Sequence, residues 1–378
     1  MHDFLIKEIS NTNIEKELEN IGFDKTYTRF AKDKFVYKNF KIYDLTPAQA
    51  NILKQTAISV GADCGTHREV ITGKIEKSNC ILGGSISQII KISKKLQAQP
   101  FGLKDLGKLL EEKVKTQPSQ TKIMGILNVT TNSFSDGGEY YRFEDSIKHL
   151  NQLIEDGADI IDIGAESTKP YSDAVSAENQ LEKIEPILKY IKEKNINIPI
   201  SIDTRSSKVA KKCIELGANI INDVSGFDYD SEMVNVLAKN PNTKIIIQHS
   251  KGTPETMQNS PTYENLMDEI FANLKEKVDF ATSKGIKKEN IIIDPGIGFG
   301  KTRNDNFEII HRWKEFKTIG CPILIGLSRK SLLNMPQATN DEKDIYTLAL
   351  NSILINENIN MIRVHNVRLH RTFLSILK

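Results

Sequence analysis

The chain has 378 residues, of which 39% are hydrophobic and 26% are charged, and its formal net charge is +2. That composition is typical of a globular protein, and the balance of opposite charges gives no electrostatic basis for binding nucleic acid. The amino-terminal residues are too polar for a signal peptide, and no apolar run approaches the roughly 18 residues of a membrane span. The 4 cysteines form no CxxC pair, so we expect reduced thiols in a cytoplasmic protein that binds no membrane.

Residues 1–118 predict a small N-terminal α/β domain whose role the sequence does not reveal. Apolar residues recur at helical spacing in three segments and form strand-like runs in two: 11–21, 47–61, 85–96, 35–43 and 79–82. Residues 103–120 are expected to join this domain to the rest of the chain. Its role stays open between docking onto the barrel, oligomerisation and a fused second activity.

Residues 119–378 contain eight short apolar runs, each ending at a polar side chain. The runs are 123–129, 158–163, 198–202, 219–221, 245–247, 291–293, 322–327 and 361–364. Parallel strands buried on both faces form such continuous runs. A doubly wound sheet is the alternative, but it does not require polar residues at all eight strand ends. We therefore predict a (β/α)8 TIM barrel with its active site at the carboxyl ends of the strands.

Amphipathic segments separate these runs and predict the outer helices of the barrel. They are 146–156, 178–194, 206–216, 231–238, 263–284, 304–314, 344–356 and 367–377. Gly157, Gly217 and Gly285 each follow such a segment, where a left-handed helix cap is expected.

Two long polar loops follow the first two runs. Residues 128–138 exceed an ordinary connection in length and end in Gly-Gly, which predicts a lid. Asn128 and Asp136 offer it the oxygen ligands that a hard cation prefers. The second loop, 162–170, predicts recognition of a polar substrate, although Glu166 alternatively caps backbone amides.

Polar side chains also end three runs in the middle of the barrel. Asp203, Asn222 and Asp294 suit a planar heterocycle with an amidine-like edge, because a carboxylate accepts two parallel N–H bonds. Asp162 and Asp223 stand at similar positions, and their role stays open between ligand binding and tying strands together.

The segment from Asp294 to Thr302 resembles a phosphate-binding loop, but Pro295 occupies a position where the Walker motif requires glycine. Its glycines are expected to let the backbone approach a flat ligand, with Phe299 as one wall.

The last two strand ends carry most of the positive charge. Ser328 is predicted to cap a helix whose amino terminus, with Arg329 and Lys330, forms an anion-binding corner. Arg363 and His365 lie two residues apart on one strand and therefore on the same side. Together these residues predict a clamp for a polyphosphate leaving group.

Seven motifs in order make residues 123–378 closely resemble the dihydropteroate synthases, pterin-binding barrel enzymes of folate biosynthesis. They are Asn-Val-Thr-x-x-Ser-Phe-Ser-Asp-Gly-Gly, Gly-x-Glu-Ser-Thr-x-Pro, Ser-Ile-Asp-Thr, Ile-Asn-Asp-Val, Asp-Pro-Gly-x-Gly-Phe-Gly-Lys, Gly-x-Ser-Arg-Lys-Ser and Arg-Val-His. The resemblance implies a transferase that condenses 6-hydroxymethyl-7,8-dihydropterin diphosphate with p-aminobenzoate, giving 7,8-dihydropteroate and pyrophosphate. It also implies a Mg²⁺ cofactor and a homodimer.

The resemblance further implies a role for each matching residue. The pterin would contact Asp203, Asn222, Asp294, Gly298 and Lys330. The diphosphate would contact Asn128, Arg363 and His365, with Mg²⁺ on Asn128 and Asp136. The p-aminobenzoate would contact Thr168, Lys169, Phe299 and Ser328. The catalytic set would be Asp203, Lys330, Arg363 and His365.

The family favours ionisation of the pterin-methyl diphosphate before attack by the amine. A neutral aniline nitrogen is already nucleophilic, so no strong general base is required, and we assign no such role to His249. The chain departs from the family at Ala165, at Lys169, where Arg is common, and at Asn366, where Asp is usual. Lys lacks the planar fork of Arg, which affects the contacts expected from the second loop.

Two other functions fit parts of this pattern. A pterin-binding methyltransferase domain would not need the anion-binding corner or the long first loop. A non-catalytic pterin-binding protein would not need Asn128, Asp203, Lys330 and His365 all to be present.

Overall fold

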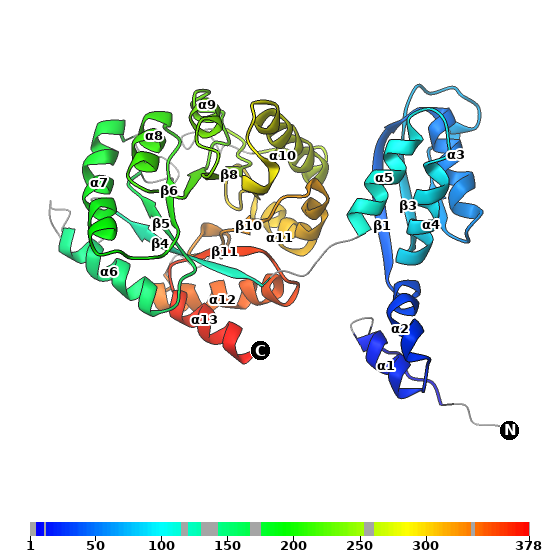
Figure 1. Cartoon of the computed structure of the whole chain (residues 1–378), viewed down its shortest axis with the longest axis horizontal. Helices are drawn as coiled ribbons and strands as arrows, with labels where there is room; N and C mark the ends of the chain where they lie inside the picture. The colour runs from blue at the N-terminus through cyan, green and yellow to red at the C-terminus, as the bar shows by residue number, and fades with distance from the viewer. Residues whose placement is uncertain are drawn as a thin grey trace. The chain divides into compact units, whose positions relative to one another are not determined.

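The structure is a computed structural model that describes residues 5–10, 13–114, 120–129, 143–166, 175–252, 261–333 and 337–377. The chain divides into two compact units, Met1–Gln117 and Pro118–Lys378 (Figure 1). Among the described residues, no helix is long and apolar enough to cross a membrane.

The first unit is built on a three-stranded antiparallel sheet in the order β1-β3-β2, which confirms its predicted α/β character. Its strands are β1 (Tyr37–Leu45), β2 (Asp63–Gly65) and β3 (Ser78–Ser85). Its helices are α1 (Ile14–Asn20), α2 (Lys25–Ala31), α3 (Pro47–Ile58), α4 (Ile86–Leu96) and α5 (Leu103–Val114). Residues 103–114, expected to belong to a joint, instead form α5, whose Leu110 lies in the same core as Ile89 of α4.

The second unit contains eight parallel strands, which confirms the predicted barrel. They are β4 (Lys122–Asn128), β5 (Ile160–Gly164), β6 (Ile200–Asp203), β7 (Ile220–Asp223), β8 (Lys244–Gln248), β9 (Ile291–Asp294), β10 (Leu324–Ile325) and β11 (Met361–Val364). The strands pair in the order β10-β11-β4-β5-β6-β7-β8-β9. A bridge between Ile293 and Ile323 closes the ring from β9 to the start of β10.

In the part of this unit that the structure describes, eight helices alternate with the strands. They are α6 (Phe143–Glu155), α7 (Ala177–Glu193), α8 (Ser207–Glu215), α9 (Met233–Ala238), α10 (Leu266–Ser283), α11 (Arg303–Arg312), α12 (Asn340–Asn356) and α13 (Val367–Ile376). The glycines predicted to follow α6, α8 and α10 do adopt the left-handed conformation, with φ values of +88°, +106° and +96° at Gly157, Gly217 and Gly285. These left-handed residues end the helices and turn the chain toward the next strand.

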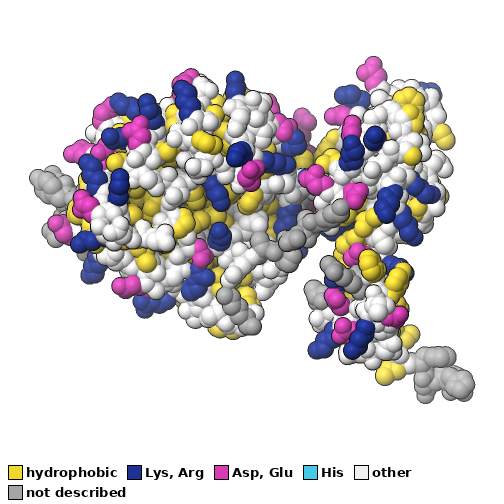
Figure 2. Space-filling model, in the orientation of Figure 1, with side chains coloured by type: hydrophobic (Ala, Val, Ile, Leu, Met, Phe, Trp, Pro, Cys, Tyr) yellow, Lys and Arg dark blue, Asp and Glu magenta, His cyan; other side chains and the backbone are white. Residues whose placement is uncertain are grey.

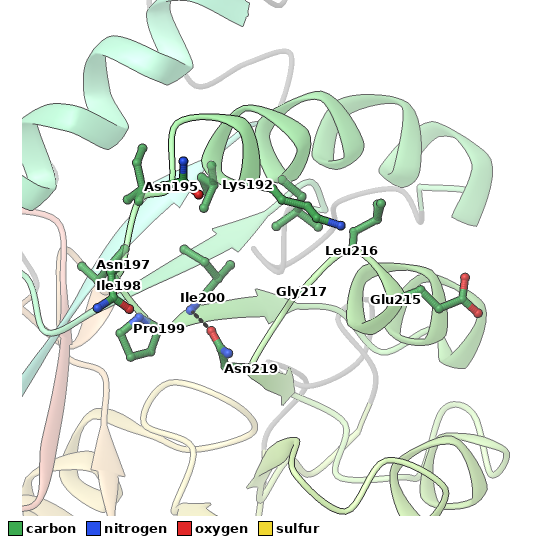
Figure 3. A pocket seen from close by; sticks show the side chains of 13 residues that line it. Lys192, Asn195, Asn197, Ile198, Pro199, Ile200, Glu215, Leu216, Gly217 and Asn219 are labelled. Carbon is green, nitrogen blue, oxygen red and sulfur yellow. Dashed lines mark hydrogen bonds between the residues drawn. The ribbon is translucent and has the colours of Figure 1, made fainter.

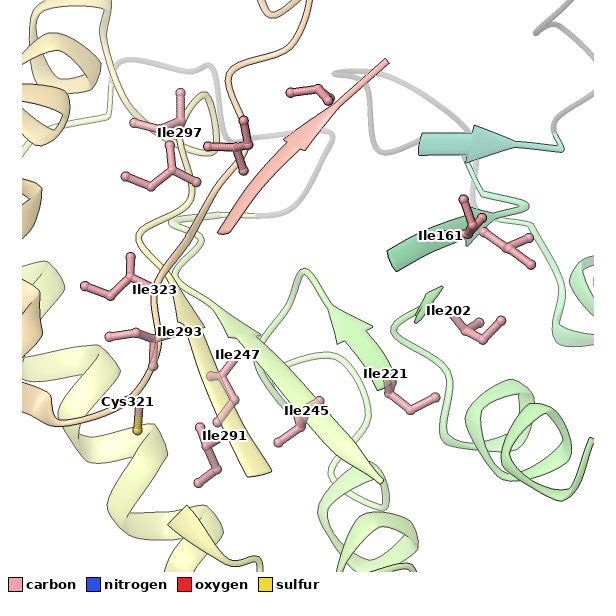
Figure 4. Packing of buried hydrophobic residues seen from close by; sticks show 14 of the residues in the cluster. Ile161, Ile202, Ile221, Ile245, Ile247, Ile291, Ile293, Ile297, Cys321 and Ile323 are labelled. Carbon is pink, nitrogen blue, oxygen red and sulfur yellow. The ribbon is translucent and has the colours of Figure 1, made fainter. Parts of the chain in front are cut away.

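The side chains of each strand alternate between two cores. One set, with Ile161, Ile221 and Ile245, packs between the strands and the outer helices (Figure 4). The other set fills the barrel interior and consists of Met124, Ile160, Ile220, Ile246, Ile292, Leu324 and Met361. On five of these strands the next inward position is polar, and these residues cap the apolar plug at the carboxyl end of the barrel: Asp162, Asn222, Gln248, Asp294 and Arg363.

Lys and Arg side chains are interspersed with Asp and Glu on the face of the second unit seen in Figure 2. This distribution agrees with the net charge of +2.

Candidate active site

Strand register brings the predicted ligand-binding residues to one level at the carboxyl end of the barrel. Asn128 pairs with Gly164, Gly164 pairs with Asp203, and Asp203 pairs with Asn222. A side-chain carbon placed on Gly164 would lie 3.4 Å from Cβ of Asp203 and 3.8 Å from Oδ1 of Asn128. Asn128 and Asp203 therefore flank Gly164 on either side, close enough for a side-chain carbon there to contact both.

Arg363 joins two carboxylates at the centre of this mouth. Its Nε donates to Oδ2 of Asp162 at 2.6 Å, and its Nη2 donates to Oδ2 of Asp203 at 2.7 Å. Asn222 also donates to Oδ2 of Asp162, at 3.3 Å. Asp162, whose role the sequence left open, is fully buried and holds both Asn222 and Arg363. Arg363, expected at the diphosphate, therefore lies among the residues expected to bind the pterin.

Burial and opposite charges compete in setting the protonation of this site. Burial raises the pKa of Asp203 to about 7, and the Arg363 guanidinium opposes that rise. Burial likewise raises the pKa of Asp294, against the opposing effect of Lys330. The pKa of Lys330 is lowered by burial to about 8, although Asp294 favours its charged form. The site thus holds carboxylates and cations whose ionisation depends on one another.

Lys330 also connects the residues expected to contact the pterin with the loop that follows β9. Its Nζ donates to the Ile297 carbonyl at 2.5 Å and lies 4.7 Å from the centre of the Phe299 ring. In the same loop, the Gly296 amide donates to Oδ1 of Asp294 at 2.7 Å. The predicted contacts Asp294, Lys330 and Phe299 are therefore brought together.

Ser328 does not cap a helix, contrary to the prediction. It lies in a turn before the short 3-10 helix η6 (Ser331–Leu333), and its Oγ is 2.8 Å from Nδ1 of His365. The His365 amide donates back to the same hydroxyl at 3.2 Å. This exchange places Ser328 beside His365, so the residues expected at the aminobenzoate and at the diphosphate adjoin each other.

Arg329 does not contribute positive charge to an anion-binding corner, which corrects a second expectation. Its backbone is left-handed, with φ +58°, and its guanidinium donates to both oxygens of Asp344 in α12, at 2.8 and 2.7 Å. The left-handed turn separates it from its neighbour Lys330, and only Lys330 joins the site.

The glycines after β9 mostly approach protein backbone rather than a ligand. Gly296, Gly298 and Gly300 all have positive φ. A side-chain carbon on Gly296 would lie 1.9 Å from the His249 carbonyl oxygen, and one on Gly300 would lie 2.2 Å from that of Lys251. The expectation that all these glycines open space for a ligand is therefore wrong for Gly296 and Gly300.

Some predicted residues have structural partners or are not described. Glu166 accepts two hydrogen bonds from Arg205, the shorter being 2.8 Å, and Asp223 accepts the amides of Ser225 and Phe227. Asp223 therefore shapes the turn after β7. Three predicted contacts lie outside the described residues: Asp136, Thr168 and Lys169.

Sequence reasoning missed a buried pair next to the site. Lys301 Nζ is 2.9 Å from Nδ1 of His249, and both side chains are almost inaccessible to solvent. Lys301 belongs to the matched motif Asp-Pro-Gly-x-Gly-Phe-Gly-Lys, which was the only signal for it, whereas nothing in the spacing links it to His249.

A cavity of about 490 Å³ lies at the opposite end of the barrel (Figure 3). It is lined by the ends of α7 and α8 and by residues preceding β6 and β7, including Ile191, Ile198, Glu215 and Asn219. Active sites of (β/α)8 barrels lie at the carboxyl ends of the strands. This cavity is therefore separate from the polar mouth.

The mouth defines a (β/α)8 barrel with a buried cluster of paired charges at the carboxyl ends of its strands, where the enzymes of this fold have their active sites. The family model of pterin binding enzymes matches residues 124–365. The chain belongs to that family and, by its relatives, to the dihydropteroate synthases. The dihydropteroate synthase of Clostridium beijerinckii is 43% identical over 252 residues, covering 66% of this chain and 90% of that protein.

A solved structure gives the same result. The dihydropteroate synthase of Clostridium difficile, determined in the presence of pteroic acid, is 36% identical with a TM-score of 0.63. The match covers 68% of this chain and 95% of that one.

One relative matches more of the chain than the second unit contains. The probable bifunctional folylpolyglutamate synthase/dihydropteroate synthase of Halobacterium salinarum is 35% identical over 334 residues, covering 84% of this chain. The chain spans 40% of that longer protein. The match must therefore include part of the first unit, so that unit has a counterpart in at least one relative.

Proposed function

We propose that this enzyme condenses 6-hydroxymethyl-7,8-dihydropterin diphosphate with p-aminobenzoate in folate biosynthesis. The amine nitrogen forms a bond to the pterin methyl carbon and loses one proton, the bond from that carbon to the diphosphate oxygen breaks, and pyrophosphate leaves. One observation carries the assignment of this reaction to the barrel mouth. Arg363 bridges Asp162 and Asp203 beside Asn222, so guanidinium and carboxylates meet where a polar heterocycle would bind.

The pterin binds to Asp203, Asn222, Asp294 and Lys330, with Gly298 close by. Carboxylates that accept paired N–H groups suit the amidine edge of a pterin. This role is supported by the opposed charges of Asp294 and Lys330, which leave donors and acceptors in fixed positions within a buried site. Asp203 also steadies positive charge that develops on the pterin methyl carbon when the diphosphate departs.

The diphosphate is held by Arg363 and His365, with Asn128 and Asp136 binding Mg²⁺. An amide oxygen is a ligand that Mg²⁺ accepts, and Mg²⁺ sites commonly combine one or two protein ligands with substrate phosphates. Asn128 fits this role because its Oδ1 lies at the barrel mouth near Asp203. When bound, Mg²⁺ would neutralise negative charge on the departing diphosphate oxygens.

The p-aminobenzoate binds between Phe299 and Ser328, with Thr168 and Lys169 contributing from the second loop. Support comes from Lys330, which lies over the Phe299 ring and so connects the pterin contacts to this wall. Ser328, hydrogen-bonded to His365, would hold the carboxylate next to the diphosphate contacts.

The test is pyrophosphate release when the two substrates are mixed with enzyme and Mg²⁺. Release that depends on both substrates supports the synthase. A methyltransferase domain or a non-catalytic pterin-binding protein would bind pterin but release no pyrophosphate with p-aminobenzoate.

We also propose a cytoplasmic homodimer. Cys64 and Cys80 are buried free thiols whose side chains interact, an arrangement that persists in a reducing compartment. Helix α12 exposes Ile345 and Ile353, at 57% and 36%, which supports its use as a contact between subunits. Sedimentation of the purified protein tests the dimer.

A further inference from the structure

We infer that Lys301 and His249 form a positioning pair that fastens the loop of residues 295–300 to the end of β8 and so sets the affinity for p-aminobenzoate. This inference rests on the proposed function for its kinetic consequence. Neither residue contacts a substrate in that proposal.

The loop lies against the residues that follow β8 with no spare room. The sites where Gly296 and Gly300 would carry a side-chain carbon are 1.9 and 2.2 Å from the carbonyl oxygens of His249 and Lys251. Such a close approach between two backbones is possible only with glycine at these positions. Close approach alone does not hold a loop in place, because the loop must also be bonded to its neighbour.

Lys301 supplies that bond. Its Nζ lies 2.9 Å from Nδ1 of His249, 3.0 Å from the Phe299 carbonyl and 3.4 Å from the His249 carbonyl. Three donor protons on an ammonium match these three acceptors. One acceptor belongs to the loop and two belong to the residue after β8, so the side chain bridges them directly.

The chemistry of the pair favours positioning over proton transfer. Burial lowers the pKa of Lys301 to about 7, against the opposing effect of Asp294, which favours its charged form. Charged Lys301 can only donate, so Nδ1 of His249 then accepts and the ring proton of the neutral imidazole is on Nε2. Burial lowers the pKa of His249 to about 2, with Lys301 adding to the effect, which keeps the ring neutral. A histidine held neutral at every working pH does not take up a proton during turnover.

The fastened loop carries the contacts proposed for both substrates. Phe299 is the proposed aminobenzoate wall, and the Ile297 carbonyl accepts from Lys330, a proposed pterin contact. Further bonds restrain the loop at other points: Gly298 donates to Asn306, and Gly300 accepts from Tyr263. Lys301 acts on the backbone of Phe299 itself, so its loss should displace the wall for the aminobenzoate more than the pterin contacts.

Two substitutions of His249 separate this role from others. Asn places an oxygen near the position of Nδ1 and can still accept from Lys301, whereas Gln places its oxygen near Nε2 and leaves Lys301 without this acceptor. Lys301→Met removes the donor and keeps all but the last atom's length of the side chain.

The experiment measures kcat and KM for p-aminobenzoate in the full chain, with the pterin diphosphate saturating. Lys301→Met and His249→Gln should raise this KM about tenfold, as expected when one hydrogen bond is lost, with kcat within about twofold of the parent. His249→Asn should keep both values within about twofold. An unchanged KM in Lys301→Met, or equal impairment of His249→Asn and His249→Gln, would overturn the inference. If Lys301→Met does not fold, the two His249 variants decide the matter.

A second measurement does not depend on turnover. Chymotryptic cleavage after Phe299, located by mass spectrometry, should speed up in Lys301→Met and His249→Gln and stay at the parent rate in His249→Asn. If the parent enzyme releases no pyrophosphate, the proposed function is refuted but the anchoring pair is not. Cleavage that is equal in all variants would refute the anchoring pair.

Discussion

Nη2 of Arg363 on β11 lies 2.7 Å from Oδ2 of Asp203 on β6, although 160 residues separate them in the sequence. The contact joins Arg363, which is proposed to bind the departing diphosphate, with Asp203, which is proposed to bind the pterin. Loss of either partner therefore affects both halves of the substrate.

Asp203→Asn should lower turnover about 100-fold, because removing a group aimed at developing charge costs that much in comparable sites. The variant keeps the shape of the side chain but loses the charge that faces Arg363. Pyrophosphate release with both substrates measures the effect. A matched control is Asp156→Asn, which removes a partly buried carboxylate that is bonded to Arg368 and lies outside the proposed site, and which should leave turnover unchanged. Near-normal turnover in Asp203→Asn would remove Asp203 from the mechanism.

The pKa of Asp203 predicts how pterin binding varies with pH. Burial raises this pKa to about 7 from its ordinary value of 3.8. The ionised form should bind pterin, so affinity should fall as pH drops through about 7. Arg363→Met should move this midpoint to higher pH, because the guanidinium opposes the rise. Titration of pterin binding at several pH values measures the midpoint, and identical midpoints in parent and variant would contradict the prediction.

The same shift predicts a change in stability. Between about pH 4 and 7 the folded protein holds a proton on Asp203 that the unfolded chain has released. The contribution of Asp203 to stability therefore falls as pH rises through this window and is lowest above it. Urea unfolding of parent and Asp203→Asn across this window should show the stability difference moving in favour of the variant as pH rises. A difference that is constant with pH contradicts this assignment.

Loss of the ionic contact of Arg329 should affect stability, whereas loss of the neighbouring Lys330 should affect pterin binding. Asp344→Asn weakens the two bonds from Arg329 and should cost about 2 kcal/mol of unfolding free energy while leaving both KM values unchanged. Lys330→Met should abolish measurable pterin binding without a comparable loss of stability, since burial already disfavours its charge. Denaturant unfolding and pterin titration of both variants check this contrast. Loss of pterin binding in Asp344→Asn would show that Arg329 does contribute to the site.

Gly296→Ala should be far more damaging than Gly285→Ala. Both glycines have positive φ, which costs alanine about 1 kcal/mol. A side-chain carbon at Gly285 meets nothing within 4 Å, whereas at Gly296 it would lie 1.9 Å from the His249 carbonyl. We expect a loss of about 1 kcal/mol for Gly285→Ala and about 3 kcal/mol or more for Gly296→Ala, from unfolding in urea. Equal losses would show that the loop moves freely away from β8.

The barrel was predictable because its signal is local and repeated. Apolar runs such as 219–221, 245–247 and 291–293 became the adjacent strands β7, β8 and β9, and their alternation faces Asn222 and Asp294 inward with no further information. Strand β2 was not predicted because its three residues, Asp63–Gly65, are too few to show a period.

Within the site, the sequence predicted residue types at strand ends but not their partners. Asp162 stayed open because its role depends on Arg363, which is distant in sequence and arrives only when β11 closes beside β4. Ser328 was predicted to cap a helix because Ser before Arg-Lys-Ser fits a helix start. Instead, a left-handed Arg329 and the bond to Asp344 turn the chain into η6, which frees the Ser328 hydroxyl for His365. Contacts of this kind depend on tertiary geometry and leave no periodic trace.

The most direct test of the proposed synthase activity is pyrophosphate release by the full chain. It is measured with each substrate alone and with both together, in the presence of Mg²⁺. The enzyme should release pyrophosphate and form 7,8-dihydropteroate in equal amounts, and only when both substrates are present. Lys330→Met should give neither product. No pyrophosphate with both substrates, or equal release without p-aminobenzoate, would contradict the proposed activity.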